Sequence, residues 1–539
     1  MDVRSDMRHL ALFLVLALMA PAQETPVFRI GTRLVELNVV VTGKDGKPLK
    51  DLTENDFEVV EGGKVKPLAF FNPVDTEPAV QAELPPGVFS NRPEYAPAPP
   101  RSLTVILLDW LNTDPRDQQF ARAQVAQFLK DMNQKDRVAI YTLGARLRVA
   151  HDFSDDPASL AKAAEKIRAE WPPTGLNDEQ NLLKQAELAA TYLAQATEQT
   201  EQDAINEAAN FSKELRVTHT LKQFEFIGQR LAGMPGRKNL VWVSAGVPLI
   251  QTWSMMQVGG SANPGMKTFA REFDRAVRAV TDAGVSVYAI DARGLRTDVD
   301  APTMTELRTK RPGFGGAEQA GMRDAMAGDT LSSIQGLAEE TGGRVLRNMN
   351  ELAAGIRQSL DDAAASYTVA YYTDEDKNRK PRKLEIRLKR KDAVAFYRKS
   401  VNAGPVAVSA SGVELMQHSL AATGVLVNAQ VIDMGSKLNV TVQIDPAGLT
   451  LRPEKGAVVG QVELYYAVVG ADGKSKVDTS KVSLKLTEAQ AEQLGQNGLV
   501  LPKELGKPGN AKRLRILVRD AESGAGGIVD VDLSKAGKA

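Results

Sequence analysis

The pattern of apolar and polar residues divides the chain into segments of different character. Between residues 101 and 365, short apolar runs alternate with stretches in which apolar residues recur every three or four positions. The run Leu103–Leu108 is almost entirely apolar, which is typical of a strand buried on both faces of a parallel sheet. The stretch that follows, Arg116–Met132, has the spacing of an amphipathic helix. Repeated strand–helix alternation predicts a doubly wound α/β fold with helices on both faces of the sheet.

The same patterns predict the rest of this α/β domain. Residues 175–216 are rich in Ala, Gln and Glu and indicate a helical insertion. In a doubly wound fold the ligand site lies at the carboxyl ends of the strands. Further strands are expected at 137–143, 147–150 (a short antiparallel edge), 239–244, 285–291 and 343–346, and further helices at 158–170, 221–231, 269–283, 330–340 and 351–365.

Alternating apolar and polar residues predict β structure on both sides of the α/β domain. Residues 23–75 contain too few strands to close a sandwich alone, and the strands within 366–402 are their expected partners. The α/β domain would then be inserted in a small β domain. Residues 403–539 contain spaced short strands and predict a C-terminal β-sandwich of immunoglobulin-like type. Residues 73–100 hold eight of the 27 prolines, so 76–100 is predicted to be a semi-rigid linker.

The first 22 residues have the three parts of a secretory signal peptide. Arg4 and Arg8 precede the apolar run Leu10–Ala20, and the small residues that a signal peptidase reads end at Ala22. The apolar run is about half the length of roughly 20 residues that a membrane-spanning helix needs. We therefore expect cleavage near Ala22 and a secreted or periplasmic protein with no membrane span in the mature chain. A short membrane anchor and a buried helix are the alternatives.

Composition excludes several classes of function. The 67 Lys and Arg residues balance 67 Asp and Glu residues, which argues against a general nucleic-acid binder. The chain has no cysteine, which excludes disulfides, thiolate zinc sites and cysteine nucleophiles. The four histidines share no metal-ligand spacing. Phosphate-binding, dinucleotide-binding and nucleophile-elbow motifs are all incomplete or absent, so we expect that the chain is not an enzyme.

Four stretches resemble a von Willebrand factor type A domain. Together with the flanking β segments the resemblance covers about residues 28–402, an arrangement similar to that of the acidobacterial von Willebrand factor A-related family. It does not extend to the C-terminal β domain. The stretches are Leu107–Thr113, Arg237–Gly246, Tyr288–Leu295 and Ala338–Arg344.

The resemblance implies a divalent cation at the top of the sheet. The family binds it through an Asp-x-Ser-x-Ser motif, a loop Thr and an Asp at the end of the fourth strand. Here Asp109 matches the first Asp and Thr113 the second Ser, whereas Leu111 replaces the first Ser. Thr174 is the candidate loop Thr, and Ser244 stands where the fourth-strand Asp would be. Because Mg²⁺ prefers six oxygen ligands, these residues predict a weak, eroded Mg²⁺ site at most, and no other cofactor is implied.

The same loops form the candidate docking surface for a protein partner. Asp109 and Thr113 also have purely structural interpretations, as caps of a loop or of the next helix. Asp291 has one as well, a local ion pair with Arg293. The residues expected on the docking surface are Trp110, Asn112, Asp114, Ser244 and Asp291.

These observations favour an exported protein-interaction module, an adhesion protein or a scaffold. Two alternatives remain open: a hydrolase that uses a metal-bound water in the same cleft, and a metal-free structural scaffold. The sequence does not indicate the partner, the pathway or the oligomeric state. It also does not indicate the role of the helical insertion or of the C-terminal β domain.

Overall fold

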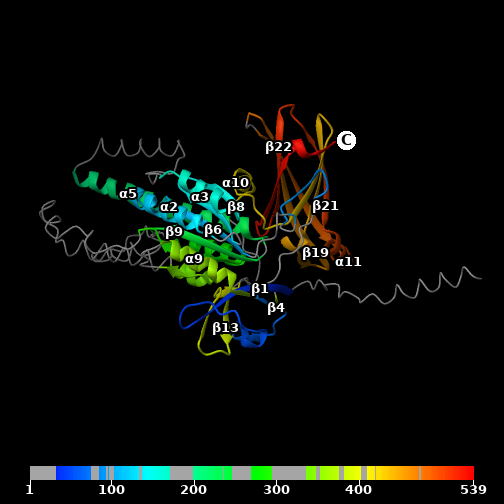
Figure 1. Cartoon of the computed structure of the whole chain (residues 1–539). Coiled ribbons are helices and arrows are strands. Elements are labelled where there is room, and N and C mark those ends of the chain that lie inside the picture. The colour runs from blue at the N-terminus through cyan, green and yellow to red at the C-terminus, as the bar shows by residue number, and fades with distance from the viewer. Residues whose placement is uncertain are drawn as a thin grey trace, which may run out of the picture. The chain divides into compact units, whose positions relative to one another are not determined.

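The structure is a computed structural model of the 539-residue chain. It describes residues 32–73, 84–92, 95, 102–132, 136–169, 198–234, 236–245, 269–293, 335–346, 352–374, 381–401, 410–418, 420–472 and 475–538. The predicted signal peptide and Thr174 lie outside these residues. The described strands belong to an α/β unit, an N-terminal β unit and a C-terminal β unit (Figure 1).

The α/β unit is built on one six-stranded sheet with the order β11-β10-β9-β6-β7-β8. Neighbouring strands are parallel except for β8, which runs antiparallel to β7 at one edge. Numbered within the unit, this order is 3-2-1-4-5-6, that of a doubly wound fold, so the predicted α/β fold is confirmed. The strands are β6 (Ser102–Asp109), β7 (Arg137–Leu143), β8 (Leu147–Ser154), β9 (Arg237–Ser244), β10 (Val285–Asp291) and β11 (Val345–Leu346).

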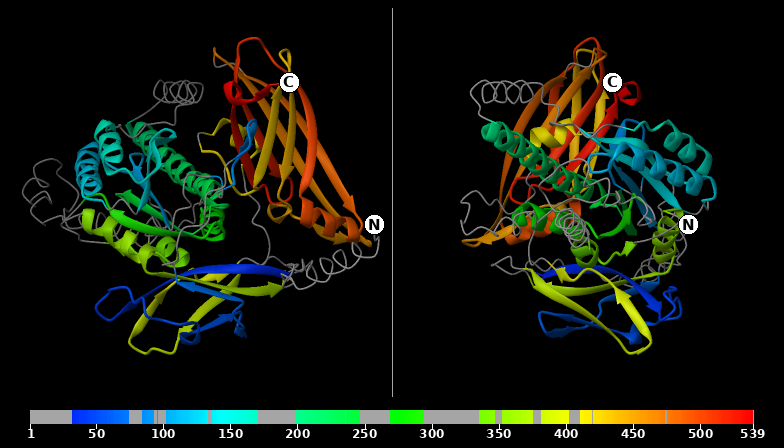
Figure 2. Two further views of the ribbon diagram at one scale, coloured as in Figure 1. Left: turned by 45° about the vertical axis from the view of Figure 1, so that its right-hand side comes forward. Right: turned by 90° about the vertical axis from the view of Figure 1, so that its left-hand side faces the viewer.

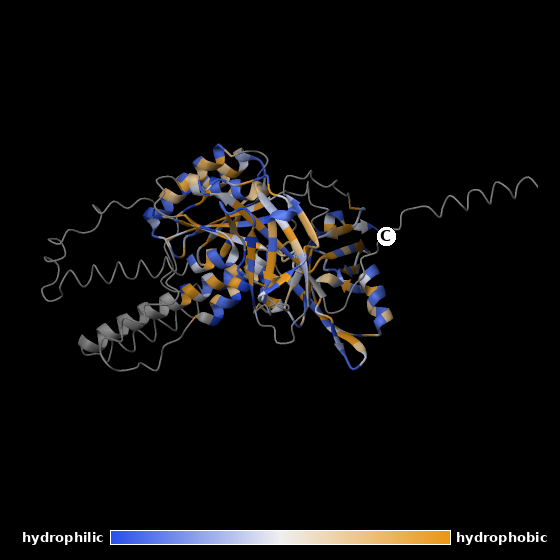
Figure 3. Ribbon diagram, turned by 90° about the horizontal axis from the view of Figure 1, so that it is seen from below, coloured by the Kyte–Doolittle hydropathy of each residue, from blue (hydrophilic) through white to orange (hydrophobic). Residues whose placement is uncertain are grey.

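Helices cover both faces of this sheet because its central strands are apolar on both sides (Figure 2). One core contains Ile106 and Leu108 of β6 together with residues of α2 (Pro115–Lys130), α3 (Pro157–Lys166) and α9 (Leu352–Ala364). The other contains Val105 and Leu107 together with residues of α5 (Glu198–Leu231) and α6 (Ala270–Asp282). Figure 3 shows hydrophobic and hydrophilic residues on the same helices, as expected for amphipathic elements.

Helix α5 differs from the prediction. The separate helix expected at 221–231 is the last part of one continuous 34-residue helix, which also includes 198–216 of the predicted insertion. No proline interrupts the sequence between Glu198 and Leu231. Gly228 lets α5 approach α6 closely, since a Cβ at this position would lie 2.7 Å from the carbonyl oxygen of Ala279.

The N-terminal β unit combines strands that precede and follow the α/β unit in the sequence. Its two four-stranded sheets have the orders β14-β1-β12-β4 and β15-β13-β2-β3, and they share one apolar core. The pairing between the N-terminal strands and those within 366–402 is therefore present. The strands are β1 (Thr32–Gly43), β2 (Phe57–Glu61), β3 (Lys64–Lys66), β4 (Phe70–Pro73), β12 (Ser366–Asp374), β13 (Arg382–Leu388), β14 (Ala393–Phe396) and β15 (Ser400–Val401).

The C-terminal β unit is a sandwich of two sheets around one core. One sheet has the order β21-β17-β16-β24, with β5 also paired to β16, and the other has the order β18-β19-β22-β23, with β20 paired to β19. That its type is immunoglobulin-like stays a prediction. Its elements are β16 (Val427–Asp433), β17 (Lys437–Ile444), β18 (Arg452–Glu454), β19 (Ala457–Gly470), β20 (Ser475–Leu486), α11 (Glu488–Asn497), β21 (Leu499–Gly506), β22 (Ala511–Asp520), β23 (Gly526–Asp532) and β24 (Gly537–Lys538), and α10 (Gly412–Gln417) precedes it.

Strand β5 (Val88–Ser90) corrects the predicted linker. These residues lie within 76–100 but pair antiparallel with β16. The proline content suggested a spacer, yet Phe89 between the prolines packs against the core of the sandwich. Among the described helices, none has both the length and the apolarity that a membrane span requires.

Candidate functional site

The candidate site lies where β6, β9 and β10 end. Asp109 is the last residue of β6, Ser244 of β9 and Asp291 of β10. Leu108 pairs with Val243, and Asp291 pairs with Ser244. The carboxyl ends of the three strands, at which the predicted loops begin, therefore lie side by side at the same end of the sheet.

Asp109 is the centre of a buried hydrogen-bond network. Its side chain is fully buried. Oδ2 accepts hydrogen bonds from Ser244 Oγ at 2.8 Å and from Trp242 Nε1 at 3.0 Å. Asn112 donates from its backbone N to Oδ1 at 3.1 Å, and its Nδ2 lies 3.0 Å from Oδ1 and 2.9 Å from Oδ2. Protein donors therefore occupy both carboxylate oxygens.

The network extends to helix α5. Asn112 Nδ2 also lies 2.9 Å from Thr220 Oγ1, which in turn donates to the carbonyl oxygen of Arg216 at 2.8 Å. Arg216 lies close enough to Asp109 for the carboxylate to raise the pKa of its guanidinium, although burial lowers that pKa more strongly. The rim loop after β6 is thus tied to the helix that carries the predicted insertion.

Thr113 and Gln118 hold the other side of this loop. Thr113 Oγ1 accepts a hydrogen bond from the backbone N of Ala245 at 3.1 Å, which joins the loops after β6 and β9. Gln118 is fully buried, and its Nε2 donates to the carbonyl oxygens of Thr113 at 2.8 Å and Trp110 at 3.1 Å. The loop between β6 and α2 is therefore restrained from both ends.

The electrostatics of Asp109 are set by burial. Removal from water raises the pKa of this carboxyl, and the hydrogen bonds from Asn112, Ser244 and Trp242 act in the opposite direction. Its nearest donors are neutral groups. Within the described residues, the arrangement compensates a buried charge by hydrogen bonds and not by a direct ion pair.

These residues do not fit a magnesium ion. Mg²⁺ requires oxygen ligands with free lone pairs, whereas Asp109 faces four donor groups and Ser244 points its hydroxyl at the carboxylate. Leu111, at the position of the first motif Ser, is fully buried in the apolar core. In the described part of the chain, no group of three or more His, Asp or Glu residues is arranged to hold a metal ion.

Two of the residues predicted for the docking surface are buried. Trp110 is 1% exposed and packs in the core between the sheet and α2, which corrects its placement on an exposed surface. An indole beside the apolar residues of α2 gains more from burial than from exposure at the rim. Ser244 is 3% exposed, and its hydroxyl donates a hydrogen bond to Asp109.

The other three predicted residues lie at the rim. Asn112 is half-buried, and Asp114 is exposed and caps α2 by accepting a hydrogen bond from the backbone N of Arg116. Asp291 forms a two-point ion pair with Arg293, with Nε–Oδ1 and Nη2–Oδ2 distances of 2.8 Å each. The structural interpretation of Asp291 therefore holds.

Trp242 has a polar role that the sequence did not lead us to expect. It is 2% exposed and contacts the ring of Phe224 in α5 edge-on, while its N–H bonds Asp109. A signal was present, since Trp242 and Ser244 stand two residues apart and so share a face of β9.

Comparisons with known proteins give the following result. No protein-family model matches the chain, and no curated protein matches it. Similar solved structures include an aerotolerance-related membrane protein from Bacteroides fragilis with multiple mutations to serines, at 12% identity over 48% of this chain and 98% of that chain, with a TM-score of 0.23. The von Willebrand factor domain of the type V pili tip protein Mfa5 from Porphyromonas gingivalis has 12% identity, 48% and 95% coverage, and a TM-score of 0.23. A von Willebrand factor type A protein from Catenulispora acidiphila has 11% identity, 89% and 74% coverage, and a TM-score of 0.23. These values are too low to bear on function.

Proposed function

We propose that this chain is an exported protein-interaction module, an adhesion protein or a scaffold. Its α/β unit, inserted in the N-terminal β unit, binds a protein partner through the loops at the carboxyl ends of β6, β9 and β10, and it does so without a divalent cation. The observation that supports cation-independent binding is the buried Asp109 carboxylate, whose two oxygens are engaged by Asn112, Trp242 and Ser244.

A cation at this position would require the network to be dismantled. Binding Mg²⁺ would separate the carboxylate from Trp242 Nε1, and this N–H is buried with the 2%-exposed indole. A buried donor without a partner costs about 1–3 kcal/mol, in addition to the cost of dehydrating Mg²⁺. The network therefore replaces the ion as the element that holds the loops after β6 and β9 in place.

The described part of the rim offers a partner a rigid, charged surface. Asp114 and Arg116 are exposed at the start of α2, and the Asp291–Arg293 pair is half-buried at the end of β10. Because hydrogen bonds restrain the loop that precedes Asp114, little conformational entropy would be lost when a partner binds.

A matched pair of variants tests this site. Asp114→Ser removes a rim charge but keeps a residue that can cap α2. Asp156→Ser makes the same change at the N-cap of α3, where Asp156 also precedes a proline. Asp156 follows β8, whose last residue, Ser154, pairs with Val138 near the start of β7. Asp156 therefore lies toward the other end of the sheet from the candidate site. We expect Asp114→Ser, but not Asp156→Ser, to weaken partner capture from envelope extract.

The same pull-down distinguishes the alternatives. Capture that is equal in EDTA and in Mg²⁺ supports cation-independent binding, and capture that EDTA abolishes contradicts it. Capture of no protein at all would favour the metal-free scaffold. Calorimetry with Mg²⁺, Mn²⁺ and Ca²⁺ tests the hydrolase, because a metal-bound water requires a tightly bound ion.

A further inference from the structure

The edge of β16 is covered by two short strands from distant parts of the sequence. Ser90, Phe89 and Val88 of β5 pair antiparallel with Asn428, Ala429 and Gln430. Further along the same edge, Gly537 and Lys538 of β24 pair parallel with Ile432 and Asp433. Between them, the backbone N of Val431 donates to the carbonyl oxygen of Gly87 at 2.9 Å. The two strands together occupy the hydrogen-bonding groups of this edge.

Gly87 is required where the two strands meet. Its φ is +76°, a left-handed conformation, and a Cβ at this position would lie 2.8 Å from the backbone N of Gly537. A residue with a side chain would separate β5 from β24 or strain the backbone. The position of Gly87, just before β5, is therefore selective for glycine.

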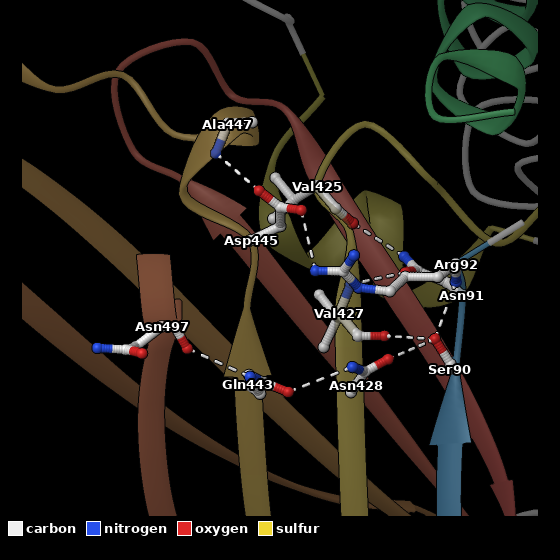
Figure 4. A network of polar contacts seen from close by, with 10 residues as sticks. All are labelled: Ser90, Asn91, Arg92, Val425, Val427, Asn428, Gln443, Asp445, Ala447 and Asn497. Atoms are coloured by element: carbon white, nitrogen blue, oxygen red, sulfur yellow. Dashed lines mark hydrogen bonds and ion pairs between the residues drawn. The ribbon is translucent and has the colours of Figure 1, made fainter. Parts of the chain in front are cut away.

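Asn91 extends the pairing with its side chain. Its Oδ1 accepts a hydrogen bond from the backbone N of Val427 at 2.7 Å, and its Nδ2 donates to the carbonyl oxygen of Val425 at 2.9 Å (Figure 4). The backbone N of Asn91 also donates to the carbonyl oxygen of Val427 at 3.2 Å. A carboxamide is the side chain that can donate and accept in one plane as a peptide group does. No Asp or Leu could make both contacts.

The neighbouring residues add a second set of side-chain contacts. Ser90 Oγ lies 2.6 Å from Asn428 Oδ1, and Arg92 Nη2 lies 2.9 Å from Asp445 Oδ2 (Figure 4). Both charged side chains of this pair are more than three-quarters buried, at 22% and 24% exposed. Phe89, which precedes Ser90 in β5, packs against the apolar core of the sandwich.

All of these groups belong to one continuous segment, Gly87–Arg92, about 340 residues before β16 in the sequence. An extended segment that adds a strand to a sheet edge gains affinity from main-chain hydrogen bonds and specificity from its alternate side chains. Because the contacts described above all come from these six residues, a separate chain with the same six residues offers the same groups. The described partners of these groups also lie within one stretch of the sequence, between Ala422 and Gly537.

We propose that the edge of β16 is a strand-acceptor site that selects the sequence Gly-Val-Phe-Ser-Asn-Arg, and that its occupant is exchangeable between copies. The chain's own Gly87–Arg92 segment occupies the edge in the single chain, and the same segment of a second copy occupies it when the first is absent. Exchange of an identical element requires no new interface. Tethering gives the chain's own segment an effective concentration of about millimolar, so the single-chain form dominates in dilute solution. This inference is independent of the proposed rim site.

Peptide binding to the full chain tests the acceptor site. The probe is a fluorescent peptide of residues 84–93, and the protein is the full chain with Phe89→Ala and Asn91→Ala, which weakens its own segment. We expect this variant to bind the peptide at least tenfold more tightly than the wild-type chain, whose site is occupied. A peptide with Ala in place of Asn91 should bind the variant at least tenfold more weakly than the original. Equal binding of the peptide by both proteins, or no binding by a variant that still unfolds cooperatively, would overturn the proposal.

Hydrogen exchange provides a readout that does not depend on the double variant. Asn91→Ala should accelerate exchange at the amide of Val427, and excess wild-type peptide should restore protection. The control is Asn439→Ala, which changes an exposed asparagine of the neighbouring strand β17 and should leave that amide protected. Equal protection in all three proteins would contradict the assigned role of Asn91.

Exchange between copies is tested by complementation. The double variant has an intact acceptor, and a second chain with Asn428→Ala and Asp445→Ala has an intact donor segment but a weakened acceptor. We expect the mixture to form a one-to-one complex in sedimentation velocity, whereas each chain alone is monomeric at the same concentration. If the peptide binds but the mixture stays monomeric, occupation by a second copy is overturned while the acceptor site stands.

Discussion

Replacing Asp109 by Ala tests the interpretation of the rim as a hydrogen-bonded structure. The change removes the acceptor for Trp242 Nε1, for Ser244 Oγ and for the two donors of Asn112. A carboxylate that coordinated a solvent-exposed cation could be removed at little cost to folding. A carboxylate that organises buried donors cannot.

The magnitude follows from the burial of each donor. Trp242 is 2% exposed, so its N–H loses its acceptor without gaining water, which costs about 1–3 kcal/mol. The hydroxyl of Ser244 can rotate toward another acceptor, which limits its loss to about 1 kcal/mol. Asn112 is half-buried and can regain part of its bonding from water. Since the variant no longer buries a carboxyl group, part of the cost is returned, and we expect a net loss of about 3 kcal/mol.

Scanning calorimetry of the two proteins measures this loss. For a unit of this size, a loss of about 3 kcal/mol lowers the midpoint of unfolding by roughly 6–12 °C. Asp114→Ala is the control, because it removes an exposed carboxylate five residues later whose described role is to cap α2. Loss of that cap costs only about 1 kcal/mol.

The pH dependence of the comparison has a defined sign. Because burial raises the pKa of Asp109 in the folded chain above its ordinary value of 3.8, the folded chain takes up this proton before the unfolded chain as the pH falls. The wild type therefore gains stability relative to Asp109→Ala between the raised pKa and 3.8. The difference in unfolding free energy should be larger near pH 4 than near pH 7.

Two results would refute the reasoning. One is a midpoint for Asp109→Ala within about 1 °C of the wild type. The other is an increase in the wild-type midpoint on addition of Mg²⁺ that the variant lacks, because a ligand that binds only the folded state raises its stability. Either result would show that the carboxylate is available to an ion.

Three further predictions concern other buried groups. Arg382→Ala removes the ion-pair partner at 2.7 Å from the carboxylate of Glu61, whose side chain is 1% exposed, and leaves it Thr373 at 2.8 Å and Lys66 at 4.0 Å. We expect a loss of about 2 kcal/mol in denaturant unfolding, and an unchanged midpoint would contradict it. Gly343→Ala would place a Cβ 2.0 Å from a carbonyl oxygen of β10, and we expect it to lower the free energy of unfolding by more than about 3 kcal/mol or to prevent folding. The control is Gly336→Ala, whose Cβ would have no atom within 4 Å and which should be neutral or stabilising; thermal unfolding of both variants measures the difference. Burial lowers the pKa of His418 to about 4 from 6.5, so the folded chain loses stability as the pH falls from 6.5 to 4. His418→Phe should reduce the dependence of the unfolding free energy on pH in this range, and an unchanged dependence would contradict the role of His418.

Regular elements could be predicted because their cause is local. The apolar run before Asp109 and the stripe after it are a strand and a helix in the structure, and the strand at 285–291 matches β10 in both bounds. Two helices were missed despite local signals: a Ser411–Glu414 capping box begins α10, and the Thr487–Gln490 capping box and Gly498 bound α11. The missed strand β21 contains Pro502 and lies at a sheet edge, where a proline is tolerated.

The role of the rim residues could not be predicted in the same way. An Asp at the end of a parallel strand is equally suited to coordinate an ion and to accept hydrogen bonds. Which of these it does depends on the donors that other strands bring to it, here Trp242 and Ser244 from β9, 133 and 135 residues away. That residue 109 is an aspartate shows which groups it can bind, but not which groups surround it in the folded chain.

The sequence by itself determined the α/β core, the flanking β structure and the convergence of three loops at one edge, because hydrophobic period and strand direction are properties of short segments. Only the tertiary structure decided that the Asp109 carboxylate is enclosed by N–H and O–H donors, and that a segment among prolines completes a sheet about 340 residues away. Both depend on pairings between distant residues. Such pairings exist only once the chain has folded, and local composition carries no record of them.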